Sequence, residues 1–157
     1  MNIEIKMKDG GIMRGELYPD VAPITVENFV KLINENFFEG LIFHRVIPGF
    51  MIQGGGFDKD FNPKETASIK GEFASNGVKN DLKHDRGVLS MARTMVPDSA
   101  SSQFFIMHET SPHLDGEYAA FGKITDGLDV LDKIATTRTD FSDAPIEPQV
   151  MEYIKLV

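Results

Sequence analysis

The architecture of this 157-residue chain is best read from residues 43–56, FHRVIPGFMIQGGG. Val46-Ile47 and Met51-Ile52 are typical of short strands, and Pro48-Gly49 between them is typical of a turn or a bulge. The segment therefore predicts two strands that are joined by a tight connection.

One face of this predicted strand pair carries an unusual set of side chains. If the strand continues through the bulge, Arg45, Met51 and Gln53 lean to the same side of the sheet. A cation, a thioether and an amide make a poor core face. We therefore predict that this face is a binding surface.

Further strands are predicted on both sides of the segment. Residues 2–8 alternate apolar and polar side chains, and residues 12–18 return after the Asp9-Gly10-Gly11 turn. Three more β-like runs cover residues 88–92, 103–107 and 150–157.

Two segments have helical periodicity instead. Residues 23–36 carry an apolar stripe, with Pro23 suited to the first turn and Thr25 as an alternative cap. The second stripe is Leu128, Leu131, Ile134 and Ala135. Many short strands, glycine-rich turns and two isolated helices predict a mainly-β fold, a closed antiparallel barrel capped by helices.

Composition limits the kinds of function that are open to the chain. The length suits one domain over residues 1–157, with no linker or repeat, and we expect a monomer. There are no cysteines, so disulfides and thiolate chemistry are excluded. A net charge of −8 argues against nucleic-acid binding. The charged N-terminal segment and the lack of a long apolar run predict a cytoplasmic location and no membrane partner.

Several polar groups resemble metal-binding or catalytic motifs but lack residues that those motifs need. The run Asp58–Asn62 resembles the start of a calcium loop, but Pro63 and Ile69 occupy the positions that need Gly and Glu, so we expect no metal. The serines of residues 99–102 lack a nucleophile elbow. Of the histidines, His44 is expected to be packed and hydrogen-bonded, and His84 and His108 to lie in loops or on the surface.

The segment FHRVIPGFMIQGG closely resembles the central signature of the cyclophilins, the peptidyl-prolyl cis-trans isomerases, in a small single-domain form like those of bacteria. LSMAR (89–93) with SSQFFI (101–106) resembles the second family signature, and HLDG (113–116) with FGK (121–123) resembles the third. Their order and spacing match over essentially the whole chain. The resemblance implies eight antiparallel strands with a helix over each end, and an active groove on the outside of the barrel.

The implied reaction is rotation about X-Pro peptide bonds, which assists protein folding. Amide resonance opposes this rotation by roughly 18–20 kcal/mol, and a catalyst needs only a site that fits the twisted amide best. No cofactor is required. A fixed donor aimed at the proline nitrogen would stabilise the twisted state, and the resemblance assigns that role to Arg45.

The resemblance also implies the rest of the site. Gln53 and Phe50 join Arg45 as catalytic residues, and Gln53 and Gln103 match amides that bond the substrate backbone and orient Arg45. The expected substrate-binding residues are Met51, Ala92, Arg93, Gln103, Phe105, His113, Leu114 and Tyr118. The implied partners are proline-containing peptides and unfolded or flexible proteins.

Three positions depart from the common family pattern. His113 stands where many cyclophilins have Trp, Tyr118 where many have His, and Arg93 where Asn is frequent. Tyrosine still offers a ring and a hydroxyl donor, so activity should survive. Because the indole N–H is lost, we expect weak binding of cyclosporin-type inhibitors.

Two other readings stay open. A proline-peptide binding module without turnover would need the pocket but could lose Arg45, which this chain keeps. A hollow ligand-binding barrel would need an empty interior, whereas Phe29, Phe104 and Ile106 are available to fill it.

Overall fold

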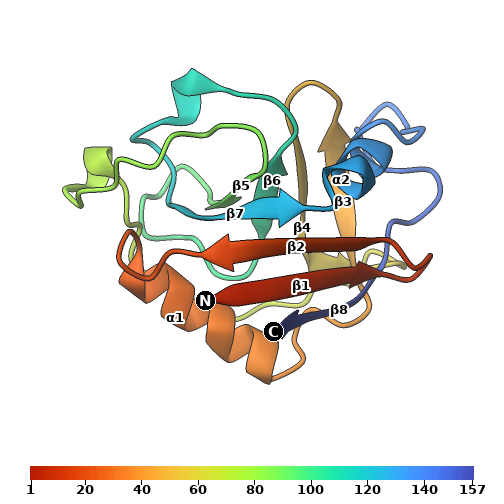
Figure 1. Cartoon of the computed structure of the whole chain (residues 1–157), viewed down its shortest axis with the longest axis horizontal. Coiled ribbons are helices and arrows are strands. Elements are labelled where there is room, and N and C mark those ends of the chain that lie inside the picture. Colours follow the sequence, from red (N-terminus) through yellow and green to blue (C-terminus); the bar gives the residue numbers. More distant parts are fainter.

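The computed structural model describes all residues, 1–157, as one eight-stranded antiparallel sheet that curls into a barrel (Figure 1). The strands are β1 (Asn2–Met7), β2 (Ile12–Leu17), β3 (Leu41–Ile47), β4 (Met51–Asp58), β5 (Val88–Met91), β6 (Phe104–Met107), β7 (Ala120–Asp126) and β8 (Met151–Leu156). Their order in the sheet is β3-β4-β6-β5-β7-β2-β1-β8. The predicted mainly-β architecture is confirmed.

The two edge strands, β3 and β8, nearly close the barrel. Ile42 forms a β-bridge with Val150, and the Gly40 N–H donates to the Met151 carbonyl at 2.9 Å. The Phe43 N–H donates to the Gln149 carbonyl at 3.0 Å. These bonds satisfy backbone groups that an open edge would leave exposed.

β7 is the strand that the periodicity of the sequence does not reveal. It has Gly122 near its centre, which interrupts the β pattern. The barrel requires glycine there, because a Cβ at Gly122 would lie 2.7 Å from the Glu16 carbonyl oxygen on the neighbouring strand β2. Close approach of two backbones therefore explains the weak strand signal.

The barrel interior is filled by phenylalanine side chains. The Phe29 ring lies 5.0 Å from those of Phe38 and Phe121 and 5.3 Å from that of Phe104, the last edge-to-face at 87°. All four rings are almost fully buried. A packed interior of this kind argues against the hollow ligand-binding barrel.

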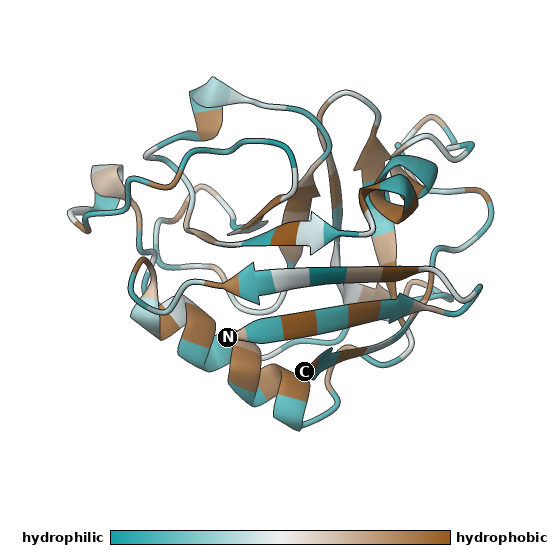
Figure 2. Ribbon diagram, in the orientation of Figure 1, coloured by the Kyte–Doolittle hydropathy of each residue, from teal (hydrophilic) through white to brown (hydrophobic).

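Two helices lie at opposite ends of the barrel, α1 (Pro23–Asn34) beside β1 and β8 and α2 (Leu128–Ala135) near β2, β3 and β4 (Figure 1). Figure 2 shows the apolar side of α1 and the alternation of hydropathy along β1. Short 3-10 turns cover Ala74–Asn76 and Pro112–Leu114. None of the helices has the length and apolar character needed to cross a bilayer.

Helix α1 begins as predicted at Pro23, but its capping is different. Ala22 occupies the N-cap position, and Thr25 donates from its N–H and its hydroxyl to the buried carboxylate of Glu72, at 2.6 and 2.7 Å. A side chain 47 residues away thus satisfies a donor of the first turn. The helix ends at Asn34, two residues earlier than expected, and Asn36 has a left-handed φ of 56°.

Candidate active site

Registers of the strands bring the predicted polar residues together. Across β3 and β4, Arg45 pairs with Gln53 and Ile47 with Met51, and across β4 and β6, Gln53 pairs with Phe105. An irregularity between Phe43 and Arg45 shifts the register in this region. The alternation expected from the sequence therefore holds across the hairpin, and Arg45, Met51 and Gln53 line the same cavity.

That cavity lies against β3, β4 and β6 and has a volume of about 240 Å³. Its lining residues are Arg45, Phe50, Met51, Gln53, Ala92, Arg93, Phe105, Leu114 and Tyr118. Gln103 lines a neighbouring cavity of similar size, and His113 lines a third of about 820 Å³. All eleven predicted residues thus lie in three cavities that share walls, which we call the trough.

Arg45 is exposed and belongs to no salt bridge. Its Nη1 lies 3.4 Å from Oε1 of Gln53, and Nε2 of Gln53 donates to Oε1 of Gln103 at 2.9 Å. The two amides form a relay that holds the guanidinium from one side. The other N–H groups of the fork stay available to a ligand in the cavity.

Beside Arg45 is an apolar slot. Met51, Phe105 and Leu114 are buried, with exposures of 2%, 5% and 6%, and Phe50 is half-buried at the rim. Tyr118 meets the Phe105 ring edge-to-face at 5.8 Å. A small apolar ring that enters the slot would be dry on one side and would face a cation on the other.

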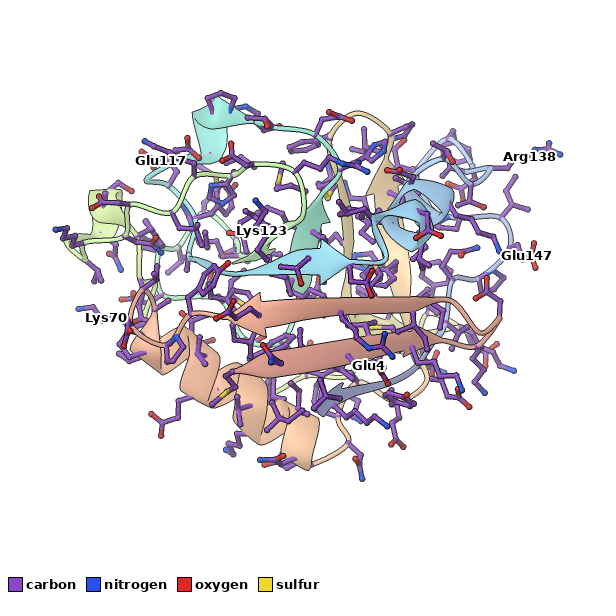
Figure 3. All side chains as sticks on the ribbon, in the orientation of Figure 1. Glu4, Lys70, Glu117, Lys123, Arg138 and Glu147 are labelled. Carbon is purple, nitrogen blue, oxygen red and sulfur yellow. The ribbon has the colours of Figure 1, made fainter.

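The Arg93 side chain has a larger role than the sequence suggests. Its guanidinium lies 4.6 Å from the Phe73 ring and 4.7 Å from the Tyr118 ring, and it donates to the carbonyls of Thr94 and Glu117. Glu117 is labelled in Figure 3, on the segment that precedes β7. Arg93 lines all three cavities, so it forms a wall of the trough with its side chain as well as its backbone.

His84 lies in a loop, as one of the two expected placements had it, but its side chain is buried rather than on the surface. Its Nε2 lies 2.8 Å from the Ser90 hydroxyl and its Nδ1 lies 3.0 Å from the Asp115 carboxylate. The set has the residue types of a hydrolytic triad, but Ser90 is fully buried and no substrate could reach it. Instead, the imidazole stacks on Phe105 at 6.0 Å and supports the slot from behind.

His108 lies in the loop after β6, as one of the two expected placements had it, and its side chain is mostly buried. Its ring accepts a hydrogen bond from the Gly49 N–H at 2.8 Å and lies 3.1 Å from the Asp132 carboxylate of α2. Nothing in the sequence around His108 indicates this pairing, because Gly49 lies 59 residues away. No group of His, Asp or Glu side chains is arranged to hold a metal ion.

His44 is packed as expected, but it is not hydrogen-bonded through Nδ1, which is buried without a partner. Its ring lies 4.8 Å from that of Phe57. Burial, reinforced by the neighbouring Arg45 charge, lowers the pKa of His44 from 6.5 to about 4. The folded protein therefore favours neutral His44.

Replacing His44 by phenylalanine is expected to weaken the loss of stability in acid. Between pH 6.5 and 4 the unfolded chain binds a proton at His44 that the folded chain does not, so stability is complete above pH 6.5 and falls below it. With allowance for partial exposure, H44F should remove about 1–2 kcal/mol of this fall. Urea unfolding at pH 7, 5 and 4 measures it. H113Q, which removes an exposed histidine, is the control. If the stability of H44F falls with pH as steeply as that of the wild type, the prediction is wrong.

Comparisons with known proteins agree with this geometry. The family model of the cyclophilin type peptidyl-prolyl cis-trans isomerases matches residues 2–156. A peptidyl-prolyl cis-trans isomerase of Acinetobacter baylyi is 50% identical over 145 residues, which cover 88% of this chain and 74% of the relative. One from Schizosaccharomyces pombe is 43% identical and covers 99% of this chain and 97% of its own.

A solved structure gives the same result. The cyclophilin type isomerase of Cryptosporidium parvum, crystallised in the presence of the dipeptide Ala-Pro, superposes with a TM-score of 0.85 at 30% identity, over 100% of this chain and 99% of that one. The barrel with its outer trough thus defines a cyclophilin, and the chain belongs to the cyclophilin type family. It is a peptidyl-prolyl cis-trans isomerase.

Proposed function

We propose that the isomerase works by stabilising the twisted X-Pro amide with the Arg45 guanidinium. When the amide twists by about 90°, resonance is lost and the proline nitrogen regains a lone pair. A donor placed at that nitrogen stabilises the twisted state more than either planar state, which is the condition for catalysis. The observation that carries the proposal is the free fork of Arg45 beside an apolar slot.

The other residues of the trough would position Arg45 and bind the substrate. Gln53 and Gln103 hold the guanidinium and offer amide groups to the substrate backbone. The proline ring would enter the slot of Phe50, Met51, Phe105 and Leu114, where burial of apolar surface supplies binding energy. Ala92 and Arg93 would border the residue before proline, and His113 and Tyr118 would form the rim.

The substrates that we propose are proline-containing peptides and unfolded or flexible proteins, so the enzyme would assist folding. Support comes from the related Cryptosporidium protein, which was crystallised in the presence of Ala-Pro. Uncatalysed X-Pro exchange takes on the order of tens to hundreds of seconds and can limit folding. A single functional unit over residues 1–157, a monomeric state and a cytoplasmic location remain predictions.

Exchange spectroscopy on a short Ala-Pro peptide tests the proposal. Catalytic amounts of the protein should bring cis–trans exchange into the range of seconds or faster. The alternative, a binding module with weak turnover, predicts that the peptide resonances shift on binding while the exchange rate stays at its uncatalysed value. That outcome would make His113 and Tyr118 the first residues to examine.

Cyclosporin-type inhibitors are expected to bind weakly. His113 is exposed at the rim, 5.9 Å from the Phe50 ring, and it lacks the area and the N–H direction of an indole. H113W should strengthen binding about tenfold, the equivalent of one hydrogen bond. Titration calorimetry measures this change, with Y118H as the comparison at the other departure from the family pattern. Equal affinity of wild type and H113W would refute it.

A further inference from the structure

The wall of the slot begins with a tight turn over residues 47–50. The Phe50 N–H donates to the Ile47 carbonyl at 3.0 Å, Pro48 takes the second position, and Gly49 has a φ of 82°. These features define a type II turn. Phe50 follows directly and lines the cavity, so the turn determines where the Phe50 ring enters the trough.

Pro48 and Gly49 favour the type II turn but do not impose it on their own. Type I and type II turns differ mainly by a flip of the central peptide, here the one that joins Pro48 to Gly49. Glycine adopts the backbone angles of both types at little cost. An outside contact with the Gly49 N–H can therefore add to this preference and hold the peptide in one orientation.

His108 supplies that contact. Its Nδ1 accepts from the Gly49 N–H at 2.8 Å, and its backbone N–H donates to the Phe50 carbonyl at 2.9 Å. The same residue thus binds the central peptide of the turn and the residue that follows it. A flip of the peptide would point the Gly49 N–H away from the ring and break the first bond.

The far side of the imidazole is fixed as well. Nε2 lies 3.1 Å from Asp132 on α2, and Asp132 is held by two bonds from Arg86, at 2.7 and 2.9 Å. A backbone N–H can only donate, so Nδ1 must be the acceptor and the proton must be on Nε2, towards the carboxylate. Both neighbours thus require the same neutral tautomer.

We infer that His108 is a positioning residue of the isomerase, which holds the Pro48-Gly49 peptide in its type II orientation and so places Phe50 in the slot. The chain of contacts runs from α2 through Asp132 and the imidazole to the turn, and it ends at a residue of the trough. His108 itself lines none of the three cavities. The inference rests on the proposed role of Phe50.

Two variants of similar shape separate positioning from general stability. H108N loses the contact with Asp132 but keeps an acceptor where Nδ1 stands, whereas H108L loses both. We expect H108L to lower kcat/KM about 3- to 10-fold, mainly through a higher KM because Phe50 contacts the ring in both planar and twisted states. H108N should stay within about twofold of wild type and keep the Gly49 amide protected from hydrogen exchange.

Equal kcat/KM values for H108N and H108L would overturn the inference. If H108L does not fold, long-range proton–nitrogen NMR spectra of the wild type decide instead, because a proton on Nδ1 of His108 would rule out the hydrogen bond from the Gly49 N–H. F50A distinguishes this failure from that of the proposed function. If F50A loses activity but H108L does not, the role inferred for His108 is wrong and the role proposed for Phe50 stands. If F50A keeps full activity, the role proposed for Phe50 is wrong.

Discussion

Replacing Arg45 by alanine is expected to lower kcat/KM for X-Pro rotation by about 100- to 1,000-fold, the range found when a fixed transition-state donor is removed. Arg93 is the other charged donor that lines the cavity, but its Nη1 and Nη2 atoms already donate to the carbonyls of Thr94 and Glu117, and its Nε atom is buried. Because Arg45 is exposed and in no salt bridge, the barrel should keep its melting temperature.

R45K provides the matched control for charge. Lysine keeps the positive charge but loses the planar fork that contacts Gln53 and, as proposed, would also reach the substrate, so R45K should resemble R45A more than wild type. Exchange spectroscopy gives the rates, and circular dichroism checks the fold. If R45A retains activity close to wild type, the donor mechanism is wrong. Wild-type activity in R45K alone would indicate that only the charge is needed.

Replacing Phe29 by alanine is expected to reduce the free energy of unfolding by about 3–5 kcal/mol, the usual cost of deleting a buried aromatic ring. The Phe29 ring is fully buried and contacts three other rings, so its loss leaves a cavity between α1 and the barrel. For a domain of this size the melting temperature should fall by about 10 °C or more.

I24A on the same helix is the control, because the Ile24 side chain is 42% exposed and its removal should change stability by less than about 1 kcal/mol. Urea unfolding of both variants measures the difference. A cost below about 1 kcal/mol for F29A would mean that α1 is not anchored through this ring. Phe29 lines none of the three cavities of the trough, so folded F29A should retain most of its activity.

Periodicity alone predicted much of the fold. The outer strands β1, β2 and β8 and the apolar stripes of both helices follow directly from alternation and helical spacing, to within two residues at most ends. Strand β7 could not be predicted in this way, because Gly122, which the close approach to β2 requires, interrupts its pattern. The closure between β3 and β8 also depends on contacts between distant residues, which local patterns do not encode.

The candidate site was predictable for a different reason. Its residues belong to three motifs with fixed spacing, and the structure brings all eleven into one trough. The histidines behind it were harder. The rings of His84 and His108 are held by the carboxylates of Asp115 and Asp132, which lie 31 and 24 residues further along the chain. The sequence alone shows neither that these two imidazoles are buried nor which of their ring nitrogens faces which partner.

The trough lies on the outer wall of the barrel, and its three cavities have lining residues in common. If the trough binds the substrate as proposed, a polypeptide can settle onto it sideways, without threading a free end through any opening. A proline in the middle of a long chain is then as accessible as one near a terminus, provided that a few residues around it are extended. Local unfolding of the client, rather than its length or its ends, would decide which prolines are turned over.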